Sequence, residues 1–257
     1  MNAHYLAFDG ITKQFGPIDV VANTDLSIEQ GSLVIFLGPS GCGKTTLMRM
    51  VGGLDHPTKG AIRLEGQVVR TPDRRRGMVF QSYSSFPWLT VEENIAFGMR
   101  YRSDMTGAEK TERCRHYLKL VGLEDFATAY PSRVSGGMRQ RVAIARTLAA
   151  GSDVLLMDEP FGALDALTRE RLQVQLREIQ IREGKTVIFV THDVEEAVFL
   201  ADRIVMFSRR PASVIADIDV NAVLGKQRPL EIRETPKFFD LRNQVLHLIR
   251  NETGDPL

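Results

Sequence analysis

The sequence predicts an α/β fold in which an inserted helical segment interrupts a mainly parallel sheet. Residues 38–45 form a glycine-rich loop between an unbroken apolar run of strand length and a stretch of helix-forming residues. After residue 151, short apolar runs alternate with helical patterns, which is typical of parallel strands joined by helices. Between these two parts, residues 82–150 carry apolar residues at helical spacing and show little strand character.

Composition places the chain among ordinary globular proteins. Of its 257 residues, 43% are hydrophobic and 25% are charged, which is enough apolar material for a sizeable core. A net charge of +1 gives no electrostatic reason to expect nucleic acid as a partner. The two cysteines form no disulfide or metal pattern, and no apolar run reaches the roughly 18 residues of a membrane span. We therefore expect a cytosolic protein that reaches a membrane only by docking on another protein.

The N-terminal part of the chain predicts short strands and an antiparallel β subdomain. A turn at residues 11–17 presents Phe15. An aromatic ring there can stack on a base, although a core or surface phenylalanine is commoner, so this segment alone leaves its role open. The strands are expected at 5–8, 25–28, 61–64 and 68–69.

The loop at residues 38–45 fits G-x-x-x-x-G-K-[ST], the phosphate-binding P-loop pattern. Its glycines let the backbone form a nest of N–H donors, and the start of the next helix adds about half a positive charge. Lys44 is expected to reach the β- and γ-phosphates of ATP, and the Thr45 hydroxyl to bind Mg²⁺. The predicted ATP-binding residues are Gly38, Pro39, Ser40, Gly41, Cys42, Gly43, Lys44, Thr45 and Thr46.

The later part of the chain returns to strand and helix alternation around an acidic pair. Gln81 ends a predicted strand at the sheet edge where α/β folds bind ligands. We expect one domain, with a nucleotide-binding core at 1–81 and 151–220, the insertion at 82–150 and a helical tail at 221–257. The predicted strands are 77–80, 153–157, 186–190 and 204–207, and the predicted helices 91–102, 108–121, 136–150, 165–183, 194–201 and 234–250.

Three polar side chains follow buried strands and carry the predicted chemistry. Asp158 is placed to hold Mg²⁺ through oxygen ligands. Glu159, the next residue, is expected to polarise an attacking water as general base. His192 follows a later strand at the same sheet edge, so it can donate to a γ-phosphate oxygen and orient the water.

Ser135-Gly136-Gly137 precedes a helix and offers a second set of backbone N–H donors to an anion. Together with the P-loop, the glutamine, the acidic pair and the histidine in this order, it resembles the ATP-binding cassette (ABC) family, whose signature reads roughly L-S-G-G-Q. The resemblance covers almost the whole chain. It implies a P-loop NTPase core, a signature at Ser135, Gly136, Gly137 and Met138, and a D-loop at 163–165 with Asp165 as its site residue. It also implies adenine stacking on Phe15 and Mg²⁺ bound near Thr45, Gln81 and Asp158.

The resemblance also implies how such a chain works. Two copies pair head to tail, and each ATP lies between one copy's P-loop and the other's signature. Hydrolysis then drives integral-membrane permease subunits, which places the chain at the cytoplasmic face of the membrane with a secreted solute-binding protein as an indirect partner. Met138 departs from the usual Gln and Gly162 from a frequent Ser, but the backbone donors survive, so we expect an active site.

Three segments look like importer subunits for nitrate, aliphatic sulfonates and taurine: 86–94, 135–141 and 161–169. The expected function is therefore an ATPase that powers uptake of a small anionic solute. The chain's end at Leu257 leads us to expect no regulatory domain of the kind that sugar-importer subunits carry. The alternatives are an importer of another solute, an ABC protein acting on nucleic acid or ribosomes, and a P-loop phosphotransferase, which would lack the signature.

An aromatic segment directly follows Gln81. Tyr83, Phe86 and Trp88 are either a small core under the helical insertion or anchors in a groove that receives a short cytoplasmic helix of the permease. We predict the second role, permease coupling, for these three residues.

Overall fold

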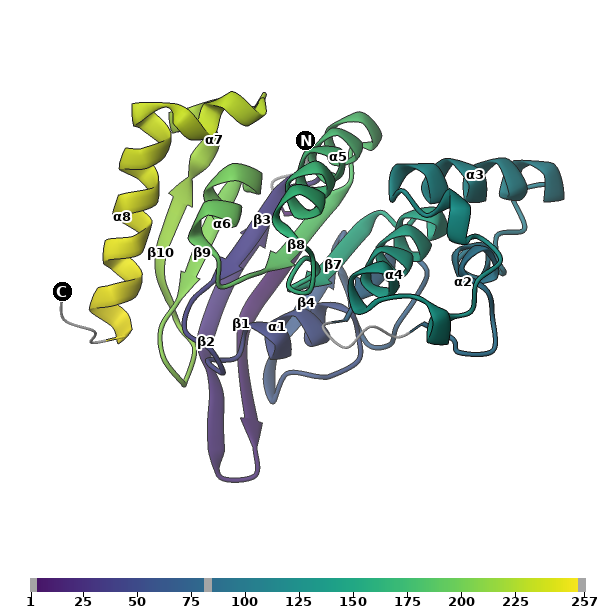
Figure 1. Cartoon of the computed structure of the whole chain (residues 1–257). Coiled ribbons are helices and arrows are strands. Elements are labelled where there is room, and N and C mark those ends of the chain that lie inside the picture. The colour runs from purple at the N-terminus through teal and green to yellow at the C-terminus, as the bar shows by residue number, and fades with distance from the viewer. Residues whose placement is uncertain (1–3, 81–84, 254–257) are drawn as a thin grey trace. The chain divides into compact units, whose positions relative to one another are not determined.

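The structure, a computed structural model, describes residues 4–80 and 85–253 (Figure 1). The chain forms two compact units: Met1–Asp73 with Arg177–Leu257, and Arg74–Leu176. The second unit contains the predicted insertion at 82–150. Gln81 and Tyr83 lie outside the described residues. Over the described ranges, no helix is long and apolar enough to cross a membrane.

An antiparallel sheet of order β2-β1-β4-β5 belongs to the first unit and confirms the predicted β subdomain. Leu6 of β1 is fully buried and lies opposite Ile28 on one side and Leu64 on the other. The strands are β1 (Leu6–Phe15), β2 (Ile18–Ile28), β4 (Lys59–Leu64) and β5 (Gln67–Val68).

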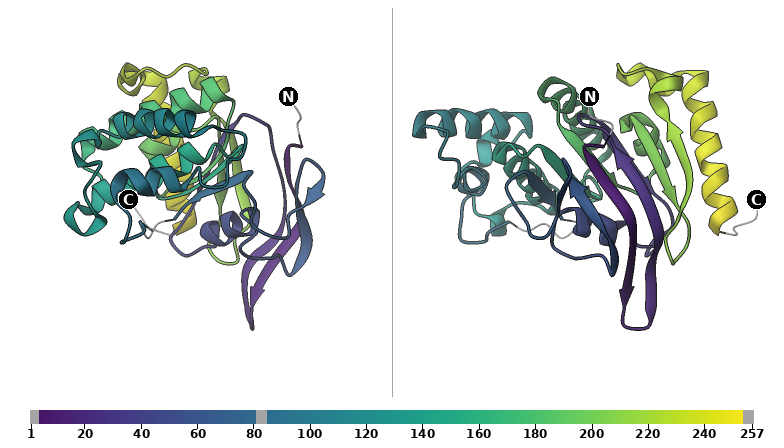
Figure 2. Two further views of the ribbon diagram at one scale, coloured as in Figure 1. Left: turned by 90° about the vertical axis from the view of Figure 1, so that its right-hand side faces the viewer. Right: turned by 180° about the vertical axis from the view of Figure 1, so that it is seen from behind.

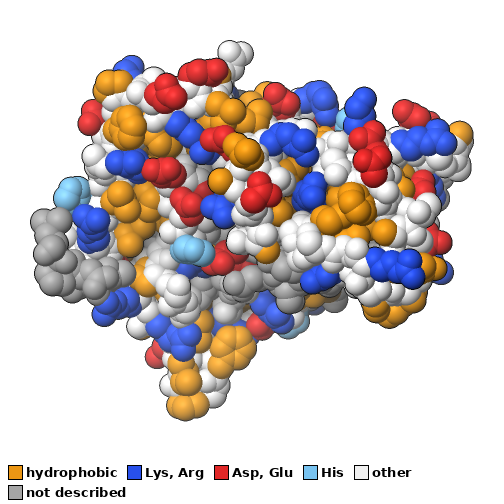
Figure 3. Space-filling view, in the orientation of Figure 1, with side chains coloured by type: hydrophobic (Ala, Val, Ile, Leu, Met, Phe, Trp, Pro, Cys, Tyr) orange, Lys and Arg blue, Asp and Glu red, His pale blue; other side chains and the backbone are white. Residues whose placement is uncertain are grey.

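The hairpin of β1 and β2 is longer than predicted. Gly10 has a φ of 53° at a register irregularity, and its N–H donates to Asp25 Oδ1 at 2.6 Å. A glycine accommodates such a bulge, so β1 continues to Phe15 where the sequence suggested a turn from residue 11. Figure 2 shows the hairpin extending from the rest of its unit, and Figure 3 shows hydrophobic side chains gathered at its tip. Phe15 and Ile18 there are 47% and 49% exposed.

The first unit also contains the strand order β10-β9-β3-β8. β3 pairs in parallel with β8 and β9, and both β3 and β8 are buried along their whole length, as their unbroken apolar sequences predict. α6 packs on β3 and α8, and Phe238, Leu241 and Val245 form the buried face of α8. The bounds are β3 (Leu33–Leu37), α1 (Lys44–Val51), β8 (Thr186–Val190), α6 (Val194–Leu200), β9 (Arg203–Phe207), β10 (Val214–Asp219), α7 (Val220–Leu224), η3 (Leu230–Glu234) and α8 (Pro236–Thr253).

The second unit is mainly helical, with β6 paired in parallel to β7. Thr90 and Thr106 begin α2 and α3 with reciprocal capping boxes to Glu93 and Glu109. α2 ends at Phe97, earlier than the predicted 102, and Gly98 then lies so close to α4 that a Cβ would come within 2.3 Å of the Arg146 carbonyl oxygen. The bounds are β6 (Arg76–Val79), α2 (Val91–Phe97), α3 (Gly107–Leu120), η1 (Glu124–Phe126), η2 (Pro131–Arg133), α4 (Gly136–Ala150), β7 (Val154–Asp158) and α5 (Ala166–Glu183), which runs on into the first unit.

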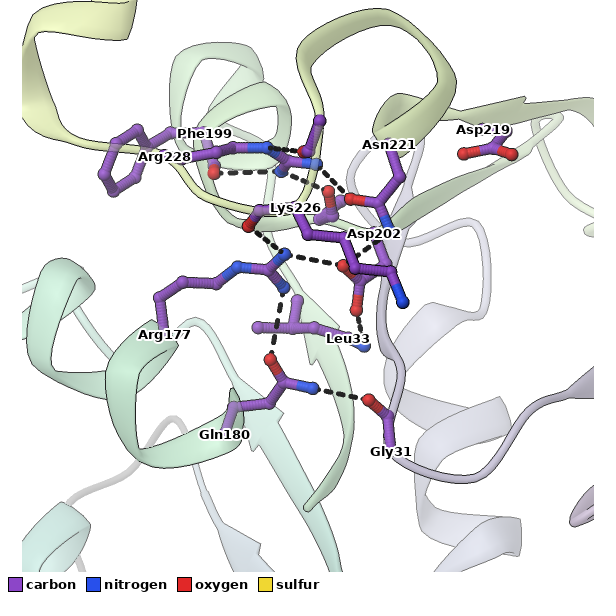
Figure 4. Close-up of polar contacts among 12 residues, drawn as sticks. Gly31, Leu33, Arg177, Gln180, Phe199, Asp202, Asp219, Asn221, Lys226 and Arg228 are labelled. Carbon is purple, nitrogen blue, oxygen red and sulfur yellow. Dashed lines mark hydrogen bonds and ion pairs between the residues drawn. The ribbon is translucent and has the colours of Figure 1, made fainter. Parts of the chain in front are cut away.

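A buried polar network ties the end of α5 to β9 and to the chain after α7 (Figure 4). The Arg177 guanidinium donates to Asp202 Oδ1 at 2.6 Å, and Asp202 Oδ2 accepts from the Leu33 N–H at 2.7 Å. Arg228 donates to the Phe199 carbonyl oxygen at 3.1 Å and also to that of Ala201, which satisfies carbonyl groups at the end of α6. The network thus joins α5 and the chain after α7 to the turn between α6 and β9.

Candidate nucleotide-binding site

The phosphate-binding loop joins β3 to α1, as predicted. Gly38, Gly41 and Gly43 have φ angles of 153°, 71° and 130°, a backbone conformation that residues with a Cβ rarely adopt. At Gly38 a Cβ would also come within 2.5 Å of the Phe207 carbonyl oxygen at the end of β9. Glycine at these positions therefore lets the loop take this path without backbone strain, and at Gly38 it also avoids a clash.

The Lys44 side chain is folded back onto this loop. Its Nζ donates hydrogen bonds of 2.7 Å to the carbonyl oxygens of Gly38 and Pro39 and lies 3.6 Å from Sγ of Cys42. Lys44 is only 6% exposed. The loop thus carries a buried ammonium at the place where P-loop proteins bind phosphate oxygens.

Arg210 is a second cation on the loop, and the sequence analysis missed it. Its Nη2 and Nε donate to the Gly41 carbonyl oxygen at 2.6 and 3.2 Å. Nearby, Ala212 accepts from the Ala22 N–H and donates to the Val20 carbonyl oxygen, each at 2.9 Å, so the segment after β9 is anchored on β2. No local sequence pattern could reveal this contact, because Arg210 and Gly41 are 169 residues apart.

The predicted acidic pair closes β7 in the second unit. Every residue of β7 is buried, and Asp158, the last of them, is 4% exposed. Glu159 has a φ of 46°, in the left-handed region. Such a conformation costs on the order of 1 kcal/mol or more and persists only where the surroundings hold it. The Glu159 carbonyl oxygen accepts hydrogen bonds of 3.3 Å from the Gly162 N–H and from Gln140 Nε2.

The predicted signature forms the start of α4, also in the second unit. Ser135 caps the helix, because its Oγ accepts from the Met138 N–H at 3.2 Å. Gly136 has open space at its Cβ position except for the Arg139 guanidinium at 3.8 Å. Met138 takes part in this cap through its backbone N–H, so the cap does not depend on the side chain at this position.

The predicted D-loop packs against the signature. A Cβ on Gly137 would lie 3.1 Å from the Ala163 carbonyl oxygen and 3.3 Å from Cδ2 of Leu164. Asp165 Oδ1 accepts from the Thr168 N–H at 3.0 Å and caps α5, and this backbone hydrogen bond lowers the pKa of Asp165. The sequence did not identify this capping role, although an aspartate before an apolar helical run is a known signal.

His192 is an exposed residue held between β8 and α6. The preceding Thr191 accepts from the Asp193 N–H at 3.0 Å, and Asp193 in turn caps α6 by accepting from the Glu196 N–H at 3.1 Å. The capped turn fixes the backbone on both sides of the histidine, as a residue that orients a reactant requires.

Phe15 ends β1 and lies close to a buried lysine. The Lys13 ammonium is 4.6 Å from the centroid of the Phe15 ring. Hydrogen bonds to Asp55 Oδ1 at 2.5 Å and to the His56 carbonyl oxygen at 2.7 Å hold that ammonium. Adenine stacking on the half-exposed ring stays a prediction.

The two units divide the predicted site residues between them. The first unit contains the phosphate-binding loop, Phe15 and His192, and the second contains Asp158, Glu159, the signature and Asp165. Gln81 and Tyr83, predicted for Mg²⁺ and for coupling, lie outside the described residues.

Phe86 lines a hollow in the second unit, and Trp88 is a ring neighbour of Phe86. The hollow has a volume of about 410 Å³, and arginine and aromatic side chains contribute to its lining. The Phe86 ring centroid is 4.5 Å from that of Phe97 and 5.6 Å from that of Trp88, and the Arg146 guanidinium carbon is 5.0 Å from it. Trp88 is 68% exposed, so it does not belong to a core under the helices.

Asn94 of α2 holds this aromatic segment. Its side chain is fully buried, accepts from the Phe86 N–H at 2.8 Å, and donates to the carbonyl oxygens of Phe86, Leu89 and Thr90 at 2.9–3.1 Å. The backbone of the aromatic segment is therefore fixed by hydrogen bonds to a buried side chain.

Comparison with known proteins identifies the family. The model of the family described as ABC transporter matches residues 21–162, more than half of the chain. The chain belongs to the ABC transporter family. Its predicted resemblance, its fold class and its activity as an ATPase are thereby confirmed.

Relatives of this ABC ATPase include importer subunits. The nitrate import ATP-binding protein NrtD of Synechocystis is 44% identical, covering 91% of this chain and 90% of its own. The bicarbonate transport ATP-binding protein CmpC of Synechococcus elongatus is 42% identical over 96% of this chain but only 38% of its own length. Among solved structures, the ATP-binding cassette MJ0796, a dimer bound to ADP and Pi, is 34% identical with a TM-score of 0.75, covering 84% of this chain and 98% of that one.

Proposed function

We propose that this ABC ATPase is the ATP-hydrolysing subunit of an importer that takes up a small anionic solute through a partner permease. The observation that carries the proposal is the 44% identity to a nitrate import protein along nine-tenths of both chains. A bicarbonate transport protein is a further relative at 42% identity. Nitrate and bicarbonate are both small oxyanions, and aliphatic sulfonates and taurine carry an anionic sulfonate group.

In the proposed hydrolysis, three residues of this chain act on the nucleotide and the attacking water. Lys44 neutralises charge on the β- and γ-phosphates, and Glu159 accepts the proton of the water whose oxygen bonds to the γ-phosphorus. The bond between that phosphorus and the bridging oxygen breaks, which releases ADP. His192 donates a hydrogen bond to a γ-phosphate oxygen and so orients the reacting group.

Mg²⁺ fits the oxygen donors that the chain offers. Thr45 supplies a hydroxyl and the buried Asp158 a carboxylate, and both are the hard ligands that Mg²⁺ prefers; Gln81 would add an amide oxygen. When bound, the ion supplies positive charge to the β- and γ-phosphate oxygens.

The proposed assembly contains a second copy of the chain. Each signature, Ser135 to Met138, would contact the nucleotide of the other copy through the N-terminal backbone of α4. The dimeric cassette MJ0796 supports this arrangement. The pair would sit at the cytoplasmic face of the membrane on its permease, which receives solute from a secreted binding protein.

The hollow that Phe86 lines, together with the neighbouring Trp88, is the proposed permease contact. A ring-lined depression and an exposed tryptophan that contacts one of its rings are suited to receive apolar residues of a short helix. Arg74, Arg76 and Arg146 also line the hollow, so a helix that carries a carboxylate would match its charge.

Uptake in cells tests the solute class. Cells that lack the chromosomal gene are given labelled nitrate, bicarbonate, taurine or a sulfonate, together with a plasmid that carries the wild-type or the Lys44→Ala gene. The proposal predicts that only the wild-type gene restores uptake of one of these anions. A labelled cationic amino acid and a labelled sugar are given to the same cells. If the wild-type gene restores uptake of one of these instead, the importer assignment stands and the anion class is wrong.

A further inference from the structure

Gln140 lies on α4, two residues beyond the signature, and its side chain is completely buried. A buried amide needs partners for both its N–H donors and its carbonyl oxygen, because an unsatisfied group costs about 1–3 kcal/mol. The partners of Gln140 are backbone groups of the segment that follows β7.

The two ends of the Gln140 amide contact two functional loops. Nε2 donates to the Glu159 carbonyl oxygen at 3.3 Å, and Oε1 accepts from the Ala163 N–H at 3.2 Å. One side chain therefore spans from the residue proposed as general base to the first residue of the D-loop.

The contact falls on a strained point of the backbone. Glu159 has a φ of 46°, and only a few per cent of residues other than glycine adopt positive φ angles. Its carbonyl oxygen accepts one bond from Gly162 N–H within the turn and one from Gln140 outside it. Gln140 thus opposes the relaxation of Glu159 to an ordinary conformation, which would re-aim the carboxylate.

The signature helix and the D-loop are also in direct contact near Gln140. The Gly137 Cα lies so close to Ala163 that an added Cβ would be 3.1 Å from its carbonyl oxygen. α4 therefore meets the catalytic segment at two places, through the bare backbone of Gly137 and through the Gln140 amide.

We propose that Gln140 is a positioning residue that holds the backbone of Glu159 in its left-handed conformation and thereby links the signature helix to the general base. The proposal rests on the proposed role of Glu159. A base that is displaced by about 1 Å loses much of its rate advantage, while nucleotide affinity does not depend on it. Loss of the hydrogen bond from Gln140 to the Glu159 carbonyl oxygen should therefore reduce kcat and leave KM unchanged.

The test compares Gln140→Met with Ile144→Ala in the full-length chain. Methionine has a similar length and volume but makes neither hydrogen bond, whereas Ile144→Ala creates a cavity one turn further along the same helix, where Ile144 is 3% exposed. ATPase kinetics and melting temperature are measured for both. We expect Gln140→Met to lower kcat at least about tenfold with KM within about twofold, and Ile144→Ala to keep its kcat despite an equal or larger loss of melting temperature.

A second variant separates the two contacts. Gln140→Glu keeps an acceptor for Ala163 N–H but, when ionised, has no proton for the Glu159 carbonyl oxygen. It should lower kcat as Gln140→Met does, and it serves alone if the methionine variant does not fold. Wild-type kcat in either folded variant overturns the proposal.

Glu159→Gln distinguishes this inference from the proposed function. If that variant hydrolyses ATP normally, the role of Glu159 is wrong and Gln140 has no base to position. If it is inactive while the Gln140 variants have the same kcat as Ile144→Ala, Glu159 is the general base but Gln140 does not position it. In the Glu159→Gln background, Gln140→Met should cause no further loss of kcat, because both changes remove the same step.

Discussion

At the scale of single residues, the site depends on charges and backbone angles that packing holds in place. The Lys44 ammonium reaches two carbonyl oxygens of its own loop, and Glu159 keeps a positive φ. Each arrangement is costly in an isolated peptide. Both persist because neighbouring backbone groups share hydrogen bonds with them.

Lys44→Ala should abolish ATP hydrolysis. The change removes the positive charge that stabilises the developing charge on the phosphates, so kcat should fall at least about tenfold, or about 1.4 kcal/mol in barrier. A phosphate-release assay on the purified variant measures this effect. Near-normal turnover by a variant of unchanged melting temperature would contradict the phosphate-binding assignment.

Arg210→Met should weaken nucleotide binding without unfolding the chain. The substitution keeps the aliphatic stem but removes both hydrogen bonds to the Gly41 carbonyl oxygen, so the phosphate-binding loop loses an anchor. We expect KM for ATP to rise about fivefold, which corresponds to roughly 1 kcal/mol, the contribution of one or two hydrogen bonds. Arg210→Lys can form a single hydrogen bond to this oxygen, so its KM should lie between those of the wild type and Arg210→Met. Identical KM values for all three proteins would show that the contact has no role in binding.

At the scale of elements, the buried pair of Arg177 and Asp202 joins α5 to β9. Burial alone would raise the pKa of Asp202, but hydrogen bonds from Arg177, the Leu33 N–H and Asn221, together with the charge of Arg177, hold it below its usual range. Burial also lowers the pKa of Arg228 to about 10, so that side chain stays charged at neutral pH. The carboxylate therefore balances two buried cations.

Asp202→Asn should destabilise the fold and reduce its acid sensitivity. Removing one partner leaves Arg177 buried without its carboxylate, which typically costs about 3 kcal/mol or more. Because the folded pKa of Asp202 is depressed, its contribution is complete above the unfolded value near 4 and is lost as the pH falls through the folded pKa. Urea unfolding at pH 7 and at successively lower pH values measures both effects. In the variant, this acid-dependent part of the unfolding free energy should be missing.

Elements with a strong local signal were predictable from the sequence, and those that depend on distant contacts were not. β8 and α4 have the predicted bounds, because an unbroken apolar run and a serine-capped helix ending at Gly151 are local patterns. β10 was missed, since its residues are largely exposed and show no buried apolar run, and its pairing with β9 supplies the stability. The site motifs were recognised by their order, whereas Gln140 and Arg210 act through residues remote in sequence.

At the scale of the whole molecule, the predicted chemistry requires residues from both units. Lys44 belongs to one unit and Glu159 to the other, and the signature is expected to serve a second copy of the chain. A variant that binds ATP without hydrolysing it should therefore accumulate as a dimer of two copies of the chain.

Glu159→Gln should form a nucleotide-bound dimer. The amide keeps the shape of the side chain but cannot take the proton, so the ATP remains intact between the two copies. Gel filtration with light scattering in the presence of Mg-ATP should give twice the monomer mass, with two nucleotides per dimer. A purely monomeric profile at micromolar protein would argue against the head-to-tail pair.

Trp88→Ala should impair coupling to the permease while sparing the isolated chain. The side chain is 68% exposed, so its loss should change the melting temperature little, whereas an aromatic anchor at an interface commonly contributes about 2 kcal/mol. The measurements are basal ATPase, permease-stimulated ATPase and co-purification with the permease. Phe86→Ala is the comparison, because Phe86 is half-buried and contacts Phe97. Equal losses of stability and coupling at both positions would favour a purely structural role.

The Arg228 contacts set a limit on how far the chain can be shortened. Residues beyond β10 follow the last strand and resemble an accessory tail, yet Arg228 satisfies carbonyl groups at the end of α6, the helix that begins directly after His192 and Asp193. Truncation before residue 228 would leave those carbonyl groups without the guanidinium and loosen the helix from its far end. A minimal version of this protein for biochemical work must therefore retain the segment through Arg228, and stepwise C-terminal deletions followed by limited proteolysis would locate that boundary.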